Sequence, residues 1–301
     1  MQRSPSSPHV RIKTKGGNVA EQVDTNVPYP TSRNLWRRII SGTVMGIIAC
    51  GLLYAGSKPF AILVMLIAIM MSWEWGRMVR AKRSDPAFLV HASSVAAAAV
   101  LTTLSRPITA LCVLLVGSLL VYLVRRPANE TLTSALGIAY VGLPSIALLW
   151  FRGDSAYGFH ATLYLLAIVW AADTAAFIGG KSIGGLKLWP SVSPNKTWAG
   201  FLSATLAAGL LGALIGRFFA PEVMLTLTAK SLFLGAISQL GDLAESGMKR
   251  GFGVKDASDL IPGHGGFMDR MDGVVAVAVA AALLALAADP ARPAWALLFG
   301  P

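Results

Sequence analysis

The sequence predicts an all-α, polytopic membrane protein with about nine transmembrane helices. Hydrophobic residues make up 54% of its 301 residues and charged residues only 14%, whereas a soluble globular chain carries roughly 25% charged residues. Apolar runs close to the ~20 residues that cross a bilayer recur along the chain. The basic residues also gather on alternate sides of those runs, as they do in membrane proteins of defined orientation.

A polar tail precedes the apolar runs. Residues 1–32 are rich in Ser, Pro, Lys and Arg and show no apolar periodicity, so we expect a disordered cytoplasmic tail there. Residues 33–301 are expected to form a single transmembrane domain. The nine expected spans are Ile39–Tyr54, Pro59–Val79, Phe88–Leu104, Ile108–Val124, Thr133–Phe151, Ala161–Gly179, Trp198–Phe218, Ala229–Ser246 and Gly273–Ala288.

The net charge of +11 follows the predicted topology. With the N-terminus inside, 20 of the 26 Lys and Arg residues fall in the tail and in the inward-facing segments, and the other six fall outside. This asymmetry encodes orientation and attraction to anionic membrane lipids, and it argues against a nucleic-acid partner. We therefore expect a multi-pass protein of the cell inner membrane. Its two longest connecting segments, 180–197 and 247–272, then both face the cytoplasm.

Two pairs of carboxylates flank the second of these segments. Asp242 and Glu245 end the eighth span and Asp269 and Asp272 begin the ninth, and each pair is spaced i, i+3 on one helix face. Ionised carboxylates are too costly to leave in hydrocarbon, so both pairs are expected to face a polar cavity. Converging carboxylates attract a cation, and hard oxygen ligands favour Mg²⁺; the alternative is ion pairing with nearby basic residues. An antiparallel helix pair would let Asp242 and Asp269 share the ion.

Basic and Gly-rich residues lie between the two pairs. Lys249, Arg250 and Lys255 offer point charges or a bidentate fork to a polyphosphate. The turn at residues 262–266 lets backbone amides approach a ligand, and it leads into a helix N-terminus, which favours anions. His264 in this turn is a candidate general acid, phosphate donor or loop-shaping hydrogen bonder.

Polar residues elsewhere add further candidates. Ser193, Lys196 and Thr197 directly precede the seventh span, where they form either an anion site or an ordinary N-cap. Asp173 is a lone acid deep within the sixth span, and intramembrane acids are functional by default. Glu74, near the inner end of the second span, is a weaker candidate because its side chain could simply snorkel to the interface.

The segment Ser246–Asp272 resembles the signature of the phosphatidate cytidylyltransferase family, the CDP-diacylglycerol synthases. Its S-x-M-K-R, K-D, P-x-H-G-G and D-R-x-D elements stand in order. The stretches that begin at Asp173 and Ser193 are also similar to family motifs, so the likeness covers about residues 165–275. The family usually has Glu two residues after the Thr of the second stretch, where this chain has Ala199.

The resemblance implies transfer of CMP from CTP to phosphatidic acid, with CDP-diacylglycerol and pyrophosphate as products. It implies Mg²⁺, with a second cation as an option, held by Asp242, Asp269 and Asp272. Lys249 and His264 complete the expected catalytic set. The expected substrate-binding residues are Asp173, Ser193, Lys196, Thr197, Ser246, Arg250, Lys255, Asp256, Gly265, Gly266 and Arg270.

Two alternatives stay open at this point. The polar motif would be unchanged in a CTP-dependent transferase or kinase that acts on another lipid, such as a polyprenol. A cation-coupled transporter also places acids within the membrane, although we would expect them near the midplane, between paired halves. The oligomeric state is open as well, a homodimer included.

Overall fold

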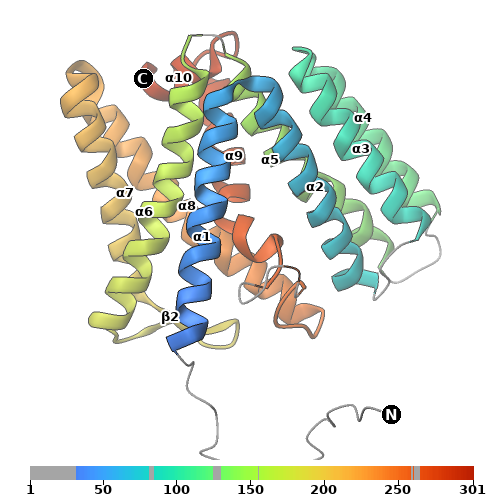
Figure 1. The fold of residues 1–301 in the computed structure, drawn as a ribbon, viewed down its shortest axis with the longest axis horizontal. Coiled ribbons are helices and arrows are strands. Elements are labelled where there is room, and N and C mark those ends of the chain that lie inside the picture. Colours follow the sequence, from blue (N-terminus) through green and yellow to red (C-terminus); the bar gives the residue numbers. More distant parts are fainter. Residues whose placement is uncertain (1–31, 81–84, 125–129, 155, 259, 261–264) are drawn as a thin grey trace, which may run out of the picture.

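Ten α-helices make up most of the part of the chain that the computed structural model describes (Figure 1). The described residues are 32–80, 85–124, 130–154, 156–258, 260 and 265–301, with the backbone alone for 32–41. The expected polar tail at residues 1–32 lies outside them except for Ser32, which begins the first helix. The helices are α1 (Ser32–Ala55), α2 (Ser57–Arg80), α3 (Pro86–Thr103), α4 (Pro107–Val124), α5 (Thr131–Gly153), α6 (Gly158–Ser182), α7 (Trp198–Phe219), α8 (Met224–Gly251), α9 (Met268–Ala288) and α10 (Pro293–Phe299).

The nine predicted spans correspond in order to α1–α9. Within the described ranges, the eight helices from α2 to α9 are long and apolar enough to cross a membrane, and α1 carries a shorter apolar stretch at Gly42–Ala55. The protein is therefore a polytopic, all-α membrane protein, as predicted. The short helix α10, after the last span, was not predicted; Lys230 of α8 donates hydrogen bonds to the carbonyls at the end of that helix.

The eighth helix is longer than predicted at both ends. It begins at Met224, directly after a 3₁₀ turn at Pro221–Val223, and continues to Gly251. Lys249 and Arg250 therefore lie in its last turn, where positive charge favours the exposed carbonyls. Gly253 follows in the left-handed conformation, at φ +72°, which helps to terminate the helix.

A small β-hairpin connects α6 to α7 and was not predicted. Strands β1 (Lys187–Trp189) and β2 (Ser193–Thr197) pair antiparallel, with Lys187 opposite Thr197. The Thr197 hydroxyl accepts a hydrogen bond of 3.1 Å from the Gly200 amide, so Thr197 caps α7. Because the hairpin ends at this cap, the start of α7 determines where the hairpin side chains lie.

Small residues bring α7 close to α8. Gly200, Ala204, Ala208, Gly212 and Gly216 recur at every fourth position of α7 and are all buried. This is the small-residue stripe that lets transmembrane backbones approach one another. A Cβ on Gly212 would lie 2.8 Å from the Leu227 carbonyl of α8, and one on Gly200 would lie 2.9 Å from the Ala176 carbonyl of α6. Neither glycine therefore leaves room for a side chain, and the first residue of the stripe faces α6.

Helix α9 joins the two sides of the bundle. It contacts α5 as well as α6 and α8, and its buried residues contribute to both apolar cores. The first residues of α1, the hairpin and the segment between α8 and α9 lie at the lower end in Figure 1, and the C-terminus and α10 lie at the upper end. The polar motif at residues 193–197 and the described residues of the motif at 246–272 therefore meet at one end of the bundle.

The close contact between α7 and α8 predicts a difference between two Gly→Ala variants. Gly51→Ala and Gly212→Ala should gain the same helix propensity, but a Cβ meets nothing within 4 Å at Gly51 and meets the Leu227 carbonyl at Gly212. Gly212→Ala should therefore be less stable than Gly51→Ala by about 1–3 kcal/mol. Thermal unfolding of the two purified variants in the same detergent measures this, and equal midpoints would contradict the packing.

Candidate active site

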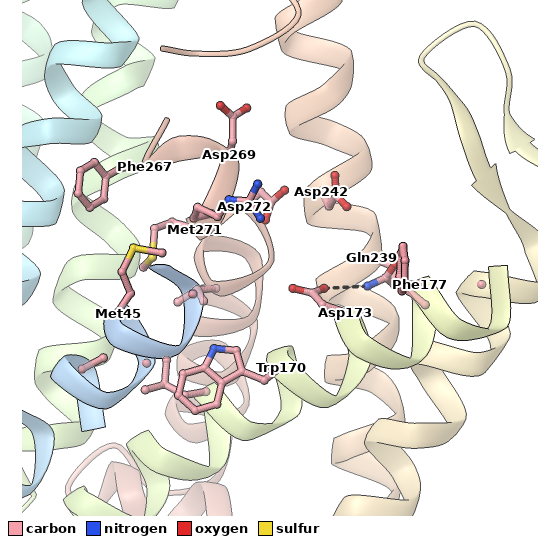
Figure 2. A pocket seen from close by; sticks show the side chains of 18 of the residues that line it. Met45, Trp170, Asp173, Phe177, Gln239, Asp242, Phe267, Asp269, Met271 and Asp272 are labelled. Atoms are coloured by element: carbon pink, nitrogen blue, oxygen red, sulfur yellow. Dashed lines mark hydrogen bonds between the residues drawn. The ribbon is translucent and has the colours of Figure 1, made fainter. Parts of the chain in front are cut away.

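A cavity of about 1330 Å³ opens among α1, α2, α6, α8, α9 and the hairpin. Its charged lining comes from α6, the hairpin, α8 and α9, and its apolar lining includes Met45 of α1, Phe60 of α2 and Trp170 of α6. Figure 2 shows acidic side chains from three helices around the same space as Met45 and Trp170. The charged residues of the lining are Asp173, Lys181, Lys196, Asp242, Asp269, Arg270 and Asp272. One cavity thus offers both polar and apolar surface.

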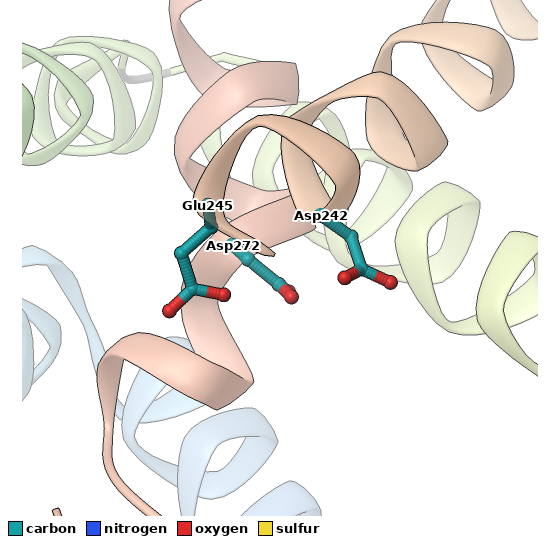
Figure 3. Close-up of side chains that lie close together, drawn as sticks. All are labelled: Asp242, Glu245 and Asp272. Carbon is teal, nitrogen blue, oxygen red and sulfur yellow. The ribbon is translucent and has the colours of Figure 1, made fainter. Parts of the chain in front are cut away.

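Three carboxylates converge at the contact between α8 and α9. Oxygens of Asp242, Glu245 and Asp272 all lie within 4.8 Å of one another, and the three side chains point toward the same region in Figure 3. Asp242 and Glu245 share a face of α8, as the i, i+3 spacing predicts. Gly241 lets α9 approach that face, because a Cβ there would lie 2.8 Å from the Asp272 carbonyl oxygen.

The three carboxylates fit a hard divalent cation. The side chain of Glu245 is fully buried, and its Oε1 atom has no hydrogen-bond partner among the described residues. Three adjacent negative charges repel one another unless positive charge lies between them. Carboxylate oxygens are the ligands that Mg²⁺ and similar ions take.

Asp269 lies outside this group, although it was expected to share an ion with Asp242. One carboxylate oxygen of Asp269 is 2.5 Å from the Lys249 Nζ. The other accepts hydrogen bonds from the backbone amides of Gly266 and Ala257, at 2.8 and 3.2 Å. The carboxylate is therefore turned toward the segment that precedes α9. Among the described residues, Glu245 and Asp272 are the acids whose oxygens lie close to those of Asp242, and a metal contact of Asp269 stays a prediction.

Lys249 lies between two carboxylates rather than on the cavity wall. Its Nζ is 3.4 Å from Glu245 Oε2 in addition to the contact with Asp269, and the residue is buried. It therefore links the group of three to the start of α9. Arg250, Lys255 and Asp256 are exposed and do not line the cavity.

The hairpin brings a second lysine to the acids. Lys196 Nζ is 2.6 Å from Asp242 Oδ2; the contact is ionic, since the ammonium group is not aligned for a hydrogen bond. Ser246 Oγ is 3.5 Å from the other oxygen of Asp242. Ser193 and Thr197 also line the cavity. The segment before α7, which carries Lys196, thus meets the carboxylates of α8 and α9 at Asp242.

Asp173 and Arg270 complete the polar wall. Asp173 accepts a hydrogen bond of 3.2 Å from the side-chain amide of Gln239, drawn as a dashed line in Figure 2. Gln239 lines the cavity as well and was not singled out from the sequence. Its spacing was the available signal: Gln239 lies three residues before Asp242 in the same span, and therefore on the same helix face.

The two described glycines of the Gly-rich turn have structural reasons for lacking a side chain. Gly265 has φ +77°, which favours glycine. A Cβ on Gly266 would lie 2.4 Å from Glu74 Oε1, and the Gly266 amide already donates to Asp269. Contact of either glycine with substrate stays a prediction. His264 lies outside the described residues.

Glu74, a weaker candidate in the sequence analysis, is fully buried in the structure. Its residue exposure is 0%, and its carboxylate accepts hydrogen bonds from the backbone amides of Phe267 and Met268, at 2.9 and 2.7 Å. It also accepts one from the Ser258 hydroxyl. An acid in an apolar helix that meets three donors is held in place rather than snorkelling.

The chain is similar to known proteins over most of its length. The sequence pattern of the cytidylyltransferase family matches residues 36–287. A phosphatidate cytidylyltransferase of Brucella suis biovar 1 (strain 1330) is 35% identical over 261 residues, which cover 86% of this chain and 97% of that protein. One of Brucella abortus biovar 1 (strain 9-941) is 36% identical over 253 residues, covering 84% and 93%. One of Staphylococcus aureus (strain COL) is 44% identical over 139 residues, covering 46% and 52%.

Fold and site together define a polytopic membrane enzyme with a charged cavity at one end of its helices. The chain belongs to the cytidylyltransferase family, so it is a nucleotidyltransferase, and the resemblance to the phosphatidate cytidylyltransferases is confirmed. Membership of this family does not favour a cation-coupled transporter.

The unpartnered oxygen of Glu245 leads to a prediction with two opposite outcomes. If a cation balances the three carboxylates, Glu245→Gln should lower cytidylyl transfer by about 10- to 100-fold, because the variant loses one anionic ligand. Glu222→Gln, at an exposed position next to α8, is the matched control and should keep wild-type activity. Initial rates over a range of Mg²⁺ concentrations measure both variants. A Glu245→Gln variant with raised thermal stability and normal activity would show instead that the buried charge binds no cation.

Proposed function

We propose that this protein transfers CMP from CTP to phosphatidic acid, giving CDP-diacylglycerol and pyrophosphate for phospholipid synthesis. The observation that carries the proposal is a single cavity that joins a charged wall to an apolar wall. A lipid with a phosphate headgroup needs both surfaces, and a nucleotide needs the first. Relatives that carry the name phosphatidate cytidylyltransferase align over most of the chain, which supports the same substrates.

In the proposed reaction, an oxygen of the lipid phosphate attacks the α-phosphorus of CTP. The bond from that phosphorus to the oxygen bridging the α- and β-phosphates breaks, and pyrophosphate leaves with the electron pair. The lipid phosphate is already ionised at neutral pH, so no separate general base is needed. Phosphoryl chemistry of this kind depends on positioning and on charge stabilisation rather than on covalent help from the protein.

Different residues around the cavity are proposed to contact the phosphates and the acyl chains of the substrates. Lys196 and Arg270 line the charged wall and are the proposed cationic contacts of the phosphates. Lys249 is proposed to act without touching the substrates: it lies outside the cavity wall and neutralises Glu245 and Asp269. Met45, Phe60 and Trp170 line the apolar wall, against which acyl chains would pack.

Mg²⁺ is the proposed cofactor, with a second cation as an option. Asp242, Asp272 and Glu245 would hold it. When bound, it would neutralise negative charge on the phosphates of CTP and the leaving pyrophosphate. The acids of the cavity wall support the proposal of a cation. A triphosphate that enters a space lined by Asp173, Asp242 and other acids meets like charge, which a cation would neutralise.

Turnover of labelled CTP tests the proposed reaction. Purified protein should form labelled CDP-diacylglycerol with phosphatidic acid present and no product without it, and a polyprenol should not replace phosphatidic acid. EDTA should abolish turnover, and added Mg²⁺ should restore it. Turnover with the polyprenol alone would redirect the proposal to another lipid; turnover that survives EDTA would remove the metal from it.

We further propose that the cavity faces the cytoplasm, where CTP is found, in a protein of the cell inner membrane. The bias of basic residues toward the end that carries the polar motifs supports this orientation. A reporter that is active only outside the inner membrane should be active when fused after Pro301 and silent when inserted near Gly185, in the turn before the hairpin. Activity at Gly185 would reverse the topology.

A further inference from the structure

The buried carboxylate of Glu74 crosses from α2 to the polar motif. Its partners lie far away in the sequence: Ser258 in the segment after α8, and Phe267 and Met268 at the start of α9. No part of the residue reaches solvent. A buried ionised carboxylate is tolerated only where donors satisfy it, and these three donors come from the segment that carries the proposed catalytic acids.

The start of α9 requires an anion because of its local geometry. The first amides of a helix have no partner within the helix, and their aligned dipoles favour negative charge. The residue that precedes α9, Phe267, provides no side-chain cap. Glu74 supplies both oxygens instead, one to each of the amides of Phe267 and Met268. Gly266 leaves the space that the carboxylate fills, since a Cβ there would lie 2.4 Å from Glu74 Oε1.

The position of this helix start determines the position of two functional acids. Asp269 is the second residue of α9, and Asp272 lies less than one turn further on. Asp269 contacts Lys249 of α8, and Asp272 joins Asp242 and Glu245 of α8. A displacement of the α9 N-terminus would therefore change the distances from Asp272 to Asp242 and to Glu245. Glu74 of α2 bonds to the first amides of that helix.

We propose that Glu74 is a positioning residue for nucleotidyl transfer: it fixes the N-terminus of α9 so that Asp272 and Asp269 meet their partners on α8. The inference rests on the proposed function for its kinetic consequence and on the hydrogen bonds alone for its structural one. A residue of α2, far outside the motif in the sequence, would thus control the distances from Asp272 to Asp242 and to Glu245.

Glu74→Gln is the most direct test, with Ser72→Ala as the matched control on the same helix. Gln keeps the size of Glu but replaces one acceptor oxygen with an NH₂ group, which would face the amide of Phe267 or Met268 donor to donor. Ser72 is also fully buried, but among the described residues its hydroxyl bonds to the Ala68 carbonyl within α2. We expect kcat to fall about 10- to 100-fold in Glu74→Gln, with a higher Mg²⁺ concentration for half-maximal rate, and to stay at the wild-type value in Ser72→Ala.

Hydrogen exchange measured by mass spectrometry supplies a readout that does not depend on activity. In Glu74→Gln, exchange should become faster in peptides that cover residues 265–272, while peptides from α6 and α7 keep wild-type rates. Glu74→Asp, which retains the charge, should recover part of both kcat and protection. Ser258→Ala, which removes one of the three donors, should give a smaller fall of about 2- to 5-fold and provides a milder variant if Glu74→Gln does not fold.

Several results would overturn the proposal. Wild-type kcat in folded Glu74→Gln would do so, as would faster exchange at the start of α9 without loss of kcat. An equal loss in Ser72→Ala would show a general effect on α2. If Glu74→Gln does not fold, wild-type kcat in both Glu74→Asp and Ser258→Ala decides against it. If the wild-type protein forms no CDP-diacylglycerol, the proposed function fails, while the exchange comparison still tests whether Glu74 holds α9.

Discussion

Like charges held side by side in an apolar bundle are the constraint on which the site depends. Asp242, Glu245 and Asp272 approach within 4.8 Å of one another, and two unit charges 4 Å apart repel by about 4 kcal/mol at an effective dielectric constant of 20. The close approach of α8 and α9 at Gly241 imposes this arrangement. Lys196, next to Asp242, and Lys249, next to Glu245, offset part of this repulsion. The remainder favours the cation that we propose, which would make the cavity suitable for phosphates.

Helix packing delivers each of these charges to one end of the bundle. The small-residue stripe of α7 lets that helix pack closely against its neighbours, α8 included. Thr197 caps α7 and ends the hairpin, so the adjacent Lys196 lies next to Asp242 of α8. Helix α1 adds Met45 and small residues such as Gly46 to the apolar wall of the same cavity. Its far end is tied down, because the guanidinium of Arg152 donates to the Leu53 carbonyl. The cavity is thus a product of several helix contacts rather than of one motif.

Part of the polar motif stabilises the structure of the site itself. The amides of Gly266, Phe267 and Met268 donate to Asp269 and Glu74 rather than to a ligand. Asp269 in turn links Lys249 to the backbone of Ala257. Residues that resemble a substrate-binding signature therefore divide into those that face the cavity and those that hold the cavity wall in place. Arg270 and Asp272 belong to the first kind, and Gly266 belongs to the second.

The sequence by itself determined the class of the fold, the order of the helices and the family. Apolar runs of membrane-spanning length and the distribution of Lys and Arg depend on composition along the chain, which needs no tertiary information. It also indicated the segments that supply most of the charged residues of the cavity, because acids and lysines are costly among apolar helices. Only the tertiary structure decided which acids meet: Glu245 joins Asp242 and Asp272, Asp269 turns to Lys249, and Glu74 reaches α9 from α2. The i, i+3 spacing places side chains on one face of a helix, but the rotation and approach of neighbouring helices set the distances between faces, and those depend on contacts such as that at Gly241.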